Sequence, residues 1–141
     1  MSTLEKAITI AANAHAGQID KAGAHYILHP LRVMLKLDTV KERIVAVLHD
    51  VIEDTAVSFE DLANEGFSPE ILEALHSVTR MPDEEYEEFV RRAGENPIGR
   101  RVKLADLEDN CDLSRIDTPT ERDFARIEKY RKAIDYLLKS A

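Results

Sequence analysis

A short run at residues 49–55, HDVIEDT, combines one imidazole with three carboxylates. These groups belong to His49, Asp50, Glu53 and Asp54. Carboxylate oxygens beside a neutral imidazole suit a hard or borderline divalent cation, such as Mn²⁺, Mg²⁺, Zn²⁺ or Fe²⁺. Acidic faces are also common on ordinary amphipathic helices, so the run alone fits a solvated helix face equally well. Ligand-type residues elsewhere in the chain must decide between the two interpretations.

Asp106 is the second candidate, in the run KLADLEDN at residues 103–110. On a helical wheel its position falls within the apolar arc. The other carboxylates of this region fall on the opposite, wet side: Glu108, Asp109 and Asp112. A carboxylate in an apolar arc is costly unless a cation or hydrogen bonds compensate it. A metal is one such partner, and the alternatives are a helix end capped by Asp106 or a nearby arginine.

His29 is the third candidate, and it precedes Pro30 at the entrance to a predicted helix. A histidine in such a place is often only a cap or a surface residue. Beside the His-Asp pair and Asp106, however, it completes a set of two histidines and two aspartates. Such a set can hold a catalytic divalent metal and leave positions open for water.

The elements that must position these residues are helices. Residues 40–54 show apolar side chains on one arc at about 100° per residue, which predicts a single buried helix that ends with the HDVIED groups. Residues 17–28, which contain several glycines, are expected to form a loop or a short irregular hairpin, where binding residues collect. Capping and proline signals predict helix starts at Pro30, Ser58, Ser68, Asp83, Asn96 and Thr118. We therefore expect one all-α domain over residues 1–141, a compact helical bundle of about seven or eight helices around a metal site.

Composition narrows the functional classes. The content of 44% hydrophobic and 33% charged residues is typical of a globular protein, and the net charge of −8 argues against a nucleic-acid partner. The single cysteine, Cys111, fits a reducing compartment. No signal peptide or membrane-length apolar run is recognisable, so we expect a cytoplasmic protein with no membrane partner. The absence of a GxxxxGK[ST] loop leaves an ATPase or kinase without support.

Three runs together resemble a known family. HPLRVM, HDVIEDT and KLADLEDN, in this order and at these separations, are similar to the HD-domain hydrolases of the RelA/SpoT homologue family, in particular the small stand-alone alarmone hydrolases. The likeness begins at AHAGQ, residues 14–18, and covers nearly the whole chain. It implies a metal-centred helical bundle and Mn²⁺-dependent removal of the 3′-pyrophosphate from (p)ppGpp, with Fe²⁺, Zn²⁺ or Mg²⁺ as other possible metals. Relatives that act on other phosphorylated nucleotides, including NADPH, are also known.

The resemblance also implies roles for individual residues. The metal ligands correspond to His29, His49, Asp50 and Asp106. The acidic pair that activates or orients the attacking water corresponds to Glu53 and Asp54, the ribose-binding asparagine to Asn110, and a phosphate-binding lysine to Lys21. From its position, Lys103 could also neutralise phosphate oxygens, as could Arg32, although a surface role fits all three basic residues equally well.

One position departs from the family pattern. (p)ppGpp hydrolases of this family usually have an arginine before that lysine, where it stacks on guanine, but here the residue is Asp20. An acidic side chain cannot provide this cation–π contact and would repel a phosphate. The residues after Asn110, CDLS, also differ from the family's usual Met-Arg-Thr type. Two hypotheses therefore remain: a metal-dependent hydrolase of (p)ppGpp or another phosphorylated nucleotide, and a non-catalytic module that binds a nucleotide or a protein.

Overall fold

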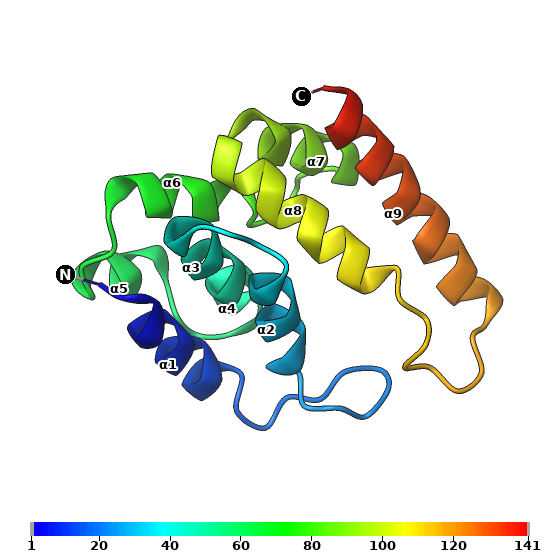
Figure 1. Cartoon of the computed structure of the whole chain (residues 1–141), viewed down its shortest axis with the longest axis horizontal. Helices are drawn as coiled ribbons and strands as arrows, with labels where there is room; N and C mark the ends of the chain where they lie inside the picture. The colour runs from blue at the N-terminus through cyan, green and yellow to red at the C-terminus, as the bar shows by residue number, and fades with distance from the viewer. Residues whose placement is uncertain (1, 141) are drawn as a thin grey trace.

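The computed structural model describes residues 2–140, and within this range it is all-helical (Figure 1). The helices are α1 (Leu4–Ala14), α2 (Leu28–Leu35), α3 (Val40–Leu48), α4 (Val51–Asp54), α5 (Phe59–Asn64), α6 (Pro69–Ser77), α7 (Tyr86–Glu95), α8 (Pro97–Asn110) and α9 (Glu121–Lys139). Between α1 and α2 the chain forms the expected loop, in which Ile19 and His25 make an isolated antiparallel bridge. The prediction of an all-α bundle is confirmed. None of the helices in residues 2–140 has both the length and the apolar character needed to cross a membrane.

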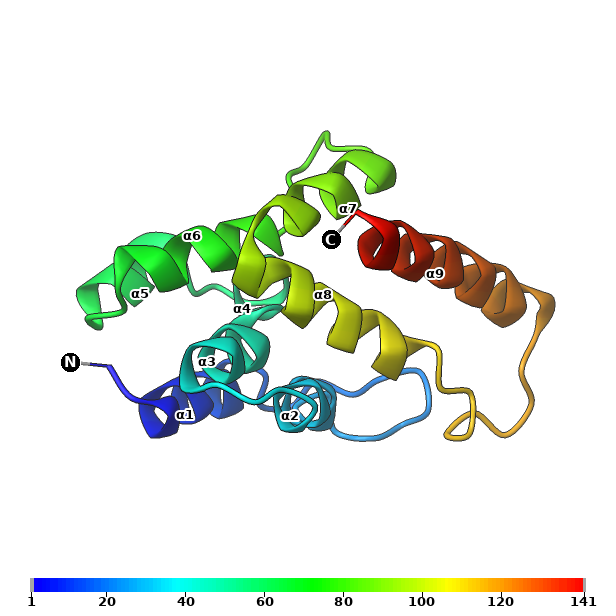
Figure 2. The ribbon, with the colours of Figure 1, turned by 45° about the horizontal axis from the view of Figure 1, so that its top comes forward.

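Helix α3 lies at the centre of the bundle. It packs against α1 and α2 on one side and against α6 and α8 on the other (Figures 1 and 2). Four of its apolar side chains are almost fully buried, which explains the apolar arc in the sequence: Ile44, Val45, Val47 and Leu48. Helix α9 follows an irregular segment and packs on α7 and α8, where a second apolar cluster forms around Leu107 and Leu137. The central position of α3 places its C-terminal end deep in the molecule.

The predicted helix over residues 40–54 is interrupted at its most polar point. Helix α3 ends at Leu48 and α4 starts at Val51, with Asp50 at φ −102° and ψ −2° between them. In a regular helix the side chains of adjacent residues diverge by about 100°, so neighbouring residues cannot point at one place. The break removes this restriction for His49 and Asp50, whose polar atoms approach to 3.1 Å. The same break raises the number of helices in residues 2–140 to nine.

Three of the six predicted helix starts lie where the capping signals are. Ser58, Ser68 and Asn96 each accept a hydrogen bond from the backbone of the first helical turn. The helix predicted to start at Pro30 begins two residues earlier, at Leu28, so Pro30 lies within its first turn. The cap of the last helix is Thr120 rather than Thr118. Thr120 forms a capping box with Asp123, whose Oδ2 accepts the Thr120 backbone N–H at 2.8 Å. The helix predicted to start at Asp83 likewise begins later, after Glu85.

Gly99 is where α8 approaches α6 closely. A Cβ atom on Gly99 would lie 2.0 Å from the Ser77 Oγ and 3.2 Å from the Ser77 Cβ. We therefore expect Gly99→Ala to lower the free energy of unfolding by about 1–3 kcal/mol, despite the higher helix propensity of alanine, because the two helices must separate. Urea denaturation measures this change. The double variant with Ser77→Ala should recover part of the loss, and a Gly99→Ala protein as stable as wild type would contradict the close approach.

Candidate metal centre

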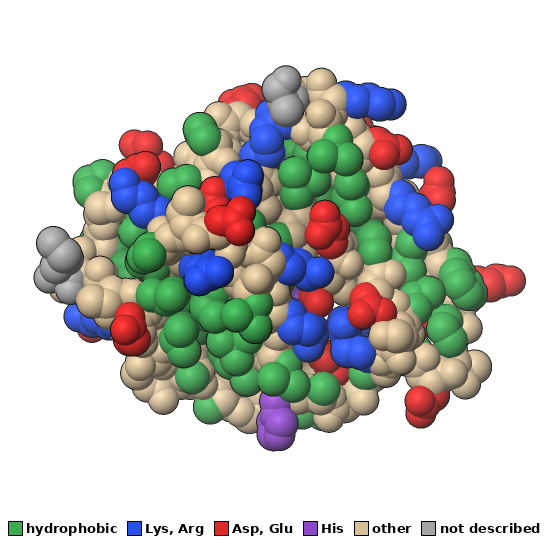
Figure 3. Space-filling view, in the orientation of Figure 1, with side chains coloured by type: hydrophobic (Ala, Val, Ile, Leu, Met, Phe, Trp, Pro, Cys, Tyr) green, Lys and Arg blue, Asp and Glu red, His purple; other side chains and the backbone are tan. Residues whose placement is uncertain are grey.

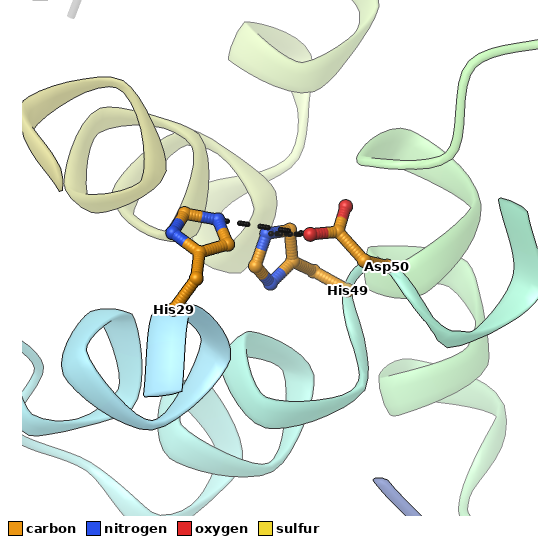
Figure 4. Close-up of side chains that lie close together, drawn as sticks. All are labelled: His29, His49 and Asp50. Atoms are coloured by element: carbon orange, nitrogen blue, oxygen red, sulfur yellow. Dashed lines mark ion pairs between the residues drawn. The ribbon is translucent and has the colours of Figure 1, made fainter. Parts of the chain in front are cut away.

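Three side chains from two neighbouring helix ends converge at the C-terminal end of α3. His29 lies on α2, His49 is the residue that follows the last residue of α3 and caps it, and Asp50 comes next in the break before α4 (Figure 4). One donor atom from each lies within 4.8 Å of the other two. The Asp50 Oδ2 is 3.1 Å from the His49 Nε2 and 3.6 Å from the His29 Nε2. The His49 Nδ1 donates to the Ala46 carbonyl oxygen at 2.5 Å, so its Nε2 is the nitrogen turned toward the cluster.

Asp106 joins this group from α8. Its side chain is buried, as predicted, and its Oδ1 lies 2.9 Å from the His29 Nε2 and 3.3 Å from the His49 Nε2. The Lys103 Nζ, one turn back, lies 3.1 Å from the Asp106 Oδ2, and the Asn110 Nδ2, one turn on, donates to the Oδ1 at 3.1 Å. Within residues 2–140, neither a helix end nor an arginine compensates this carboxylate. Its partners are the two imidazoles, a lysine and an amide.

The charges of this buried group are strongly coupled. Burial opposes the charged form of His49, but the carboxylates of Asp50 and Asp106 outweigh it and raise the pKa of His49 well above its usual value. Burial likewise opposes ionisation of Asp106, yet Lys103 and the two imidazoles hold the pKa of Asp106 well below its usual range. Two carboxylates and two imidazole nitrogens thus meet in a water-poor place, where each carboxylate requires a positive partner. This donor set fits a divalent cation, with which the imidazoles are neutral ligands.

Tyr26 belongs to the same cluster, although the sequence analysis did not single it out. Its hydroxyl donates to the Asp50 Oδ2 at 2.5 Å and lies 3.5 Å from the Asp54 Oδ2. Burial, followed by the charge of Asp50, raises the pKa of Tyr26, so this hydroxyl stays a donor at neutral pH. Its position in the loop just before His29 was the available signal.

Glu53 and Asp54 lie on α4 beside the ligand cluster. The Glu53 Oε1 accepts the backbone N–H of Arg80, which holds the carboxylate against the segment after α6. Partial burial, with the charge of Asp50, raises the pKa of both Glu53 and Asp54. A carboxylate with a raised pKa is a better proton acceptor near neutrality than an ordinary one.

A cavity of about 360 Å³ opens beside His29 and Tyr26. Its lining combines the loop before α2 with the segment after α8 and with α9: Ile19, Asp20, Lys21, Ala22, Tyr26, His29, Arg32, Asn110, Asp112, Arg115, Ile116, Arg126 and Tyr130. Four of these residues are basic, in a chain whose net charge is −8. Figure 3 shows basic side chains gathered over the region where α2 and the end of α8 lie. The structure therefore brings Lys21, Arg32 and Asn110 to one cavity.

Lys103 lies elsewhere. It is buried beneath Asp106, with its Nζ 4.4 Å from the centre of the Phe89 ring, and it does not line the cavity. Its contacts are those of a residue that holds Asp106, rather than of one that reaches a phosphate.

Asp20 has a structural role in the loop. Its Oδ1 accepts the backbone N–H groups of Ala22 at 2.9 Å and Ala24 at 3.0 Å, and its own N–H donates to the Ala24 carbonyl oxygen. A short acidic side chain that caps its own turn is a common feature of such loops. The carboxylate at the position where the resemblance predicts an arginine thus shapes the loop that presents Lys21.

Asp109 lies in a different environment from the one its helical position predicts. It was expected on the wet side of α8, but it is 4% exposed and its Oδ2 lies 2.6 Å from the His29 Nδ1. Arg32 forms two hydrogen bonds to the same carboxylate. The helical wheel failed here because α2 covers this side of α8, which no single-helix pattern reveals.

Comparisons with known proteins agree with this architecture. No protein-family model matches the sequence. A guanosine-3′,5′-bis(diphosphate) 3′-pyrophosphohydrolase from Aquifex aeolicus is 31% identical over 119 residues, which cover 76% of this chain and 17% of that protein. The same enzyme from Borreliella burgdorferi is 42% identical over 82 residues, covering 55% of this chain and 12% of that protein. The bifunctional (p)ppGpp synthase/hydrolase SpoT of Escherichia coli is 31% identical over 111 residues, which cover 75% of this chain and 15% of that protein.

A solved structure resembles the whole bundle. It is a metazoan SpoT orthologue, described as hydrolysing ppGpp and playing a role in starvation responses. The match has a TM-score of 0.76 at 27% identity and covers 97% of this chain and 86% of that one. This chain belongs to the HD-type RelA/SpoT hydrolase family. The chain covers 12–17% of the length of the three curated relatives named above.

Proposed function

We propose that this protein is a metal-dependent phosphohydrolase that removes the 3′-pyrophosphate from (p)ppGpp. The observation that supports this most directly is the convergence of His29, His49, Asp50 and Asp106 beside a cavity with basic walls. The names of the relatives point to the same reaction. We propose Mn²⁺ as the metal and the cytoplasm as the location, where the free Cys111 would remain reduced.

In this proposal the four ligands hold the cation. A divalent metal there supplies Lewis-acid activation of a phosphoryl oxygen and of water. Tyr26 keeps Asp50 in place through its short hydrogen bond, and Lys103 and Asn110 do the same for Asp106. These contacts limit the rotation of both carboxylates, so the ligand set is arranged before the metal arrives.

Proton transfer falls to Glu53 and Asp54. Either carboxylate takes a proton from the attacking water, which is made easier by its raised pKa. Lys21, Arg32 and Asn110 contact the substrate from the cavity wall, with the two cations on phosphate oxygens. Water attacks the phosphorus that is bonded to the ribose 3′ oxygen, the bond between these two atoms breaks, and the 3′ oxygen takes up a proton. The products from ppGpp are then GDP and pyrophosphate.

The loop around Asp20 supports a second candidate substrate class. Because Asp20 is engaged with its own backbone and has no guanidinium, the cavity has no arginine at the position that usually stacks on guanine. Hydrolysis of another phosphorylated nucleotide, of the NADPH type, is therefore the alternative activity.

A substrate panel tests the proposal. We expect Mn²⁺-loaded protein to hydrolyse ppGpp faster than NADPH, GTP or ATP when released phosphate or pyrophosphate is measured. Faster turnover of NADPH would select the alternative activity. No turnover of any of these nucleotides by protein with bound metal would favour the non-catalytic module.

A further inference from the structure

His29 uses both of its ring nitrogens. The Nε2 faces Asp106 and Asp50, while the Nδ1 lies 2.6 Å from the Oδ2 of Asp109 on the far side of the ring. The exposed fractions of His29 and Asp109 are 7% and 4%, so water cannot easily replace this contact. The contact at Nδ1 is therefore part of what fixes the ring.

Arg32 determines which atom donates in this contact. Its Nε donates to the Asp109 Oδ1 at 2.8 Å and its Nη2 to the Oδ2 at 3.0 Å, in a two-point pairing that suits an ionised carboxylate. An ionised carboxylate can only accept hydrogen bonds, so the proton in the contact belongs to the His29 Nδ1. A neutral His29 ring then has its lone pair on Nε2, which is the nitrogen that faces the other ligands.

We propose that Asp109 is a positioning residue for the metal centre, which selects the tautomer and orientation of His29, and that Arg32 holds Asp109 in place. The inference rests on the proposed metal-dependent function. Two residues of α8, one turn apart, then serve the metal site in different ways. Asp106 is a ligand, and Asp109 acts through His29. A carboxylate behind a ligating histidine also makes the imidazole a stronger donor.

A purely structural ion pair between α2 and α8 is the competing explanation, and the chain contains a matched control. Glu42 is also buried and also paired with an arginine, with 2.7 Å between its Oε2 and the Arg101 Nε. It lies in the first turn of α3, the opposite end from His49. Loss of its charge should affect folding but not the metal.

The experiment compares Asp109→Asn with Glu42→Gln. Asparagine can still accept the His29 N–H but lacks the charge, so we expect the dissociation constant for Mn²⁺, measured by calorimetry, to rise by about 10- to 100-fold. The visible absorption of bound Co²⁺ should also change. Glu42→Gln should bind Mn²⁺ like wild type and give an unchanged Co²⁺ spectrum. Arg32→Lys, which cannot form the two-point pairing, should weaken binding in the same direction.

The outcomes distinguish a failure of the role of Asp109 from a failure of the proposed metal-dependent function. Wild-type Mn²⁺ affinity in folded Asp109→Asn, or an equal loss in Glu42→Gln, would overturn the role of Asp109 while leaving the metal centre intact. If Asp109→Asn does not fold, Arg32→Lys decides by the same two readouts. Wild-type protein that binds neither Mn²⁺ nor Co²⁺ would refute the proposed function itself, and the role of Asp109 with it.

Discussion

Asp106→Ala protein is expected to lose its bound divalent metal and, with it, its hydrolytic activity. Asp106 contacts both imidazoles of the cluster, and its removal also leaves Lys103 buried without its partner. Residues behind a ligand change metal affinity by about 10- to 100-fold, so the loss of a ligand should exceed roughly 100-fold. Asp50→Ala should behave alike, because its Oδ2 approaches both rings. Metal content after dialysis, measured by elemental analysis, checks the prediction.

The Asp106 and Asp50 variants need a control for the loss of one negative charge. Asp83→Ala removes an exposed carboxylate in the segment between α6 and α7 and should retain the metal. Asp106→Asn offers a variant of the same shape if alanine destabilises the fold. Unchanged metal content in both ligand variants would refute the assignment of the ligands.

Glu53→Gln protein should keep its metal and lose most of its turnover. Glutamine preserves the shape of the side chain and can still accept the Arg80 backbone N–H, but it cannot take a proton. Proton transfer by a positioned side chain contributes about 10²- to 10⁴-fold to rate, which sets the expected fall in kcat. Single-turnover hydrolysis of ppGpp, measured beside metal content, separates this effect from metal loss.

Glu73→Gln is the matched control for the Glu53 variant, because Glu73 is exposed on the nearby α6. It should have wild-type kcat. Full activity of Glu53→Gln would remove Glu53 from the proposed reaction and leave Asp54 as the proton acceptor, to be tested as Asp54→Asn.

The all-α fold could be predicted from the sequence because helix caps and apolar periodicity are properties of short segments. The apolar arc from Ile44 to Leu48 is buried in the bundle centre, and helices start at the serine and asparagine caps. The interruption at Asp50 was not predictable from periodicity, because every side chain in residues 40–54 fits one continuous helix. At the break His49 and Asp50 face the same cluster, which is a tertiary arrangement that periodicity does not encode.

The site could be predicted only in part. The candidate ligands could be recognised because they are histidines and aspartates, and the buried position of Asp106 followed from its apolar neighbours. Asp109 and Tyr26 were missed because their partners, His29 and Asp50, lie 80 and 24 residues away in the sequence. The structural role of Asp20 was also hidden, since a side chain that caps its own loop looks in sequence like any exposed acid. Which helix faces cover one another is the information that sequence patterns lack.

Product analysis of ppGpp incubated with Mn²⁺-loaded protein tests the central claim most directly. Chromatography should show GDP and pyrophosphate formed in equal amounts by wild-type protein, and neither product from Asp106→Ala protein at the same concentration. Intact ppGpp after incubation with wild-type protein that demonstrably holds Mn²⁺ would contradict the claim.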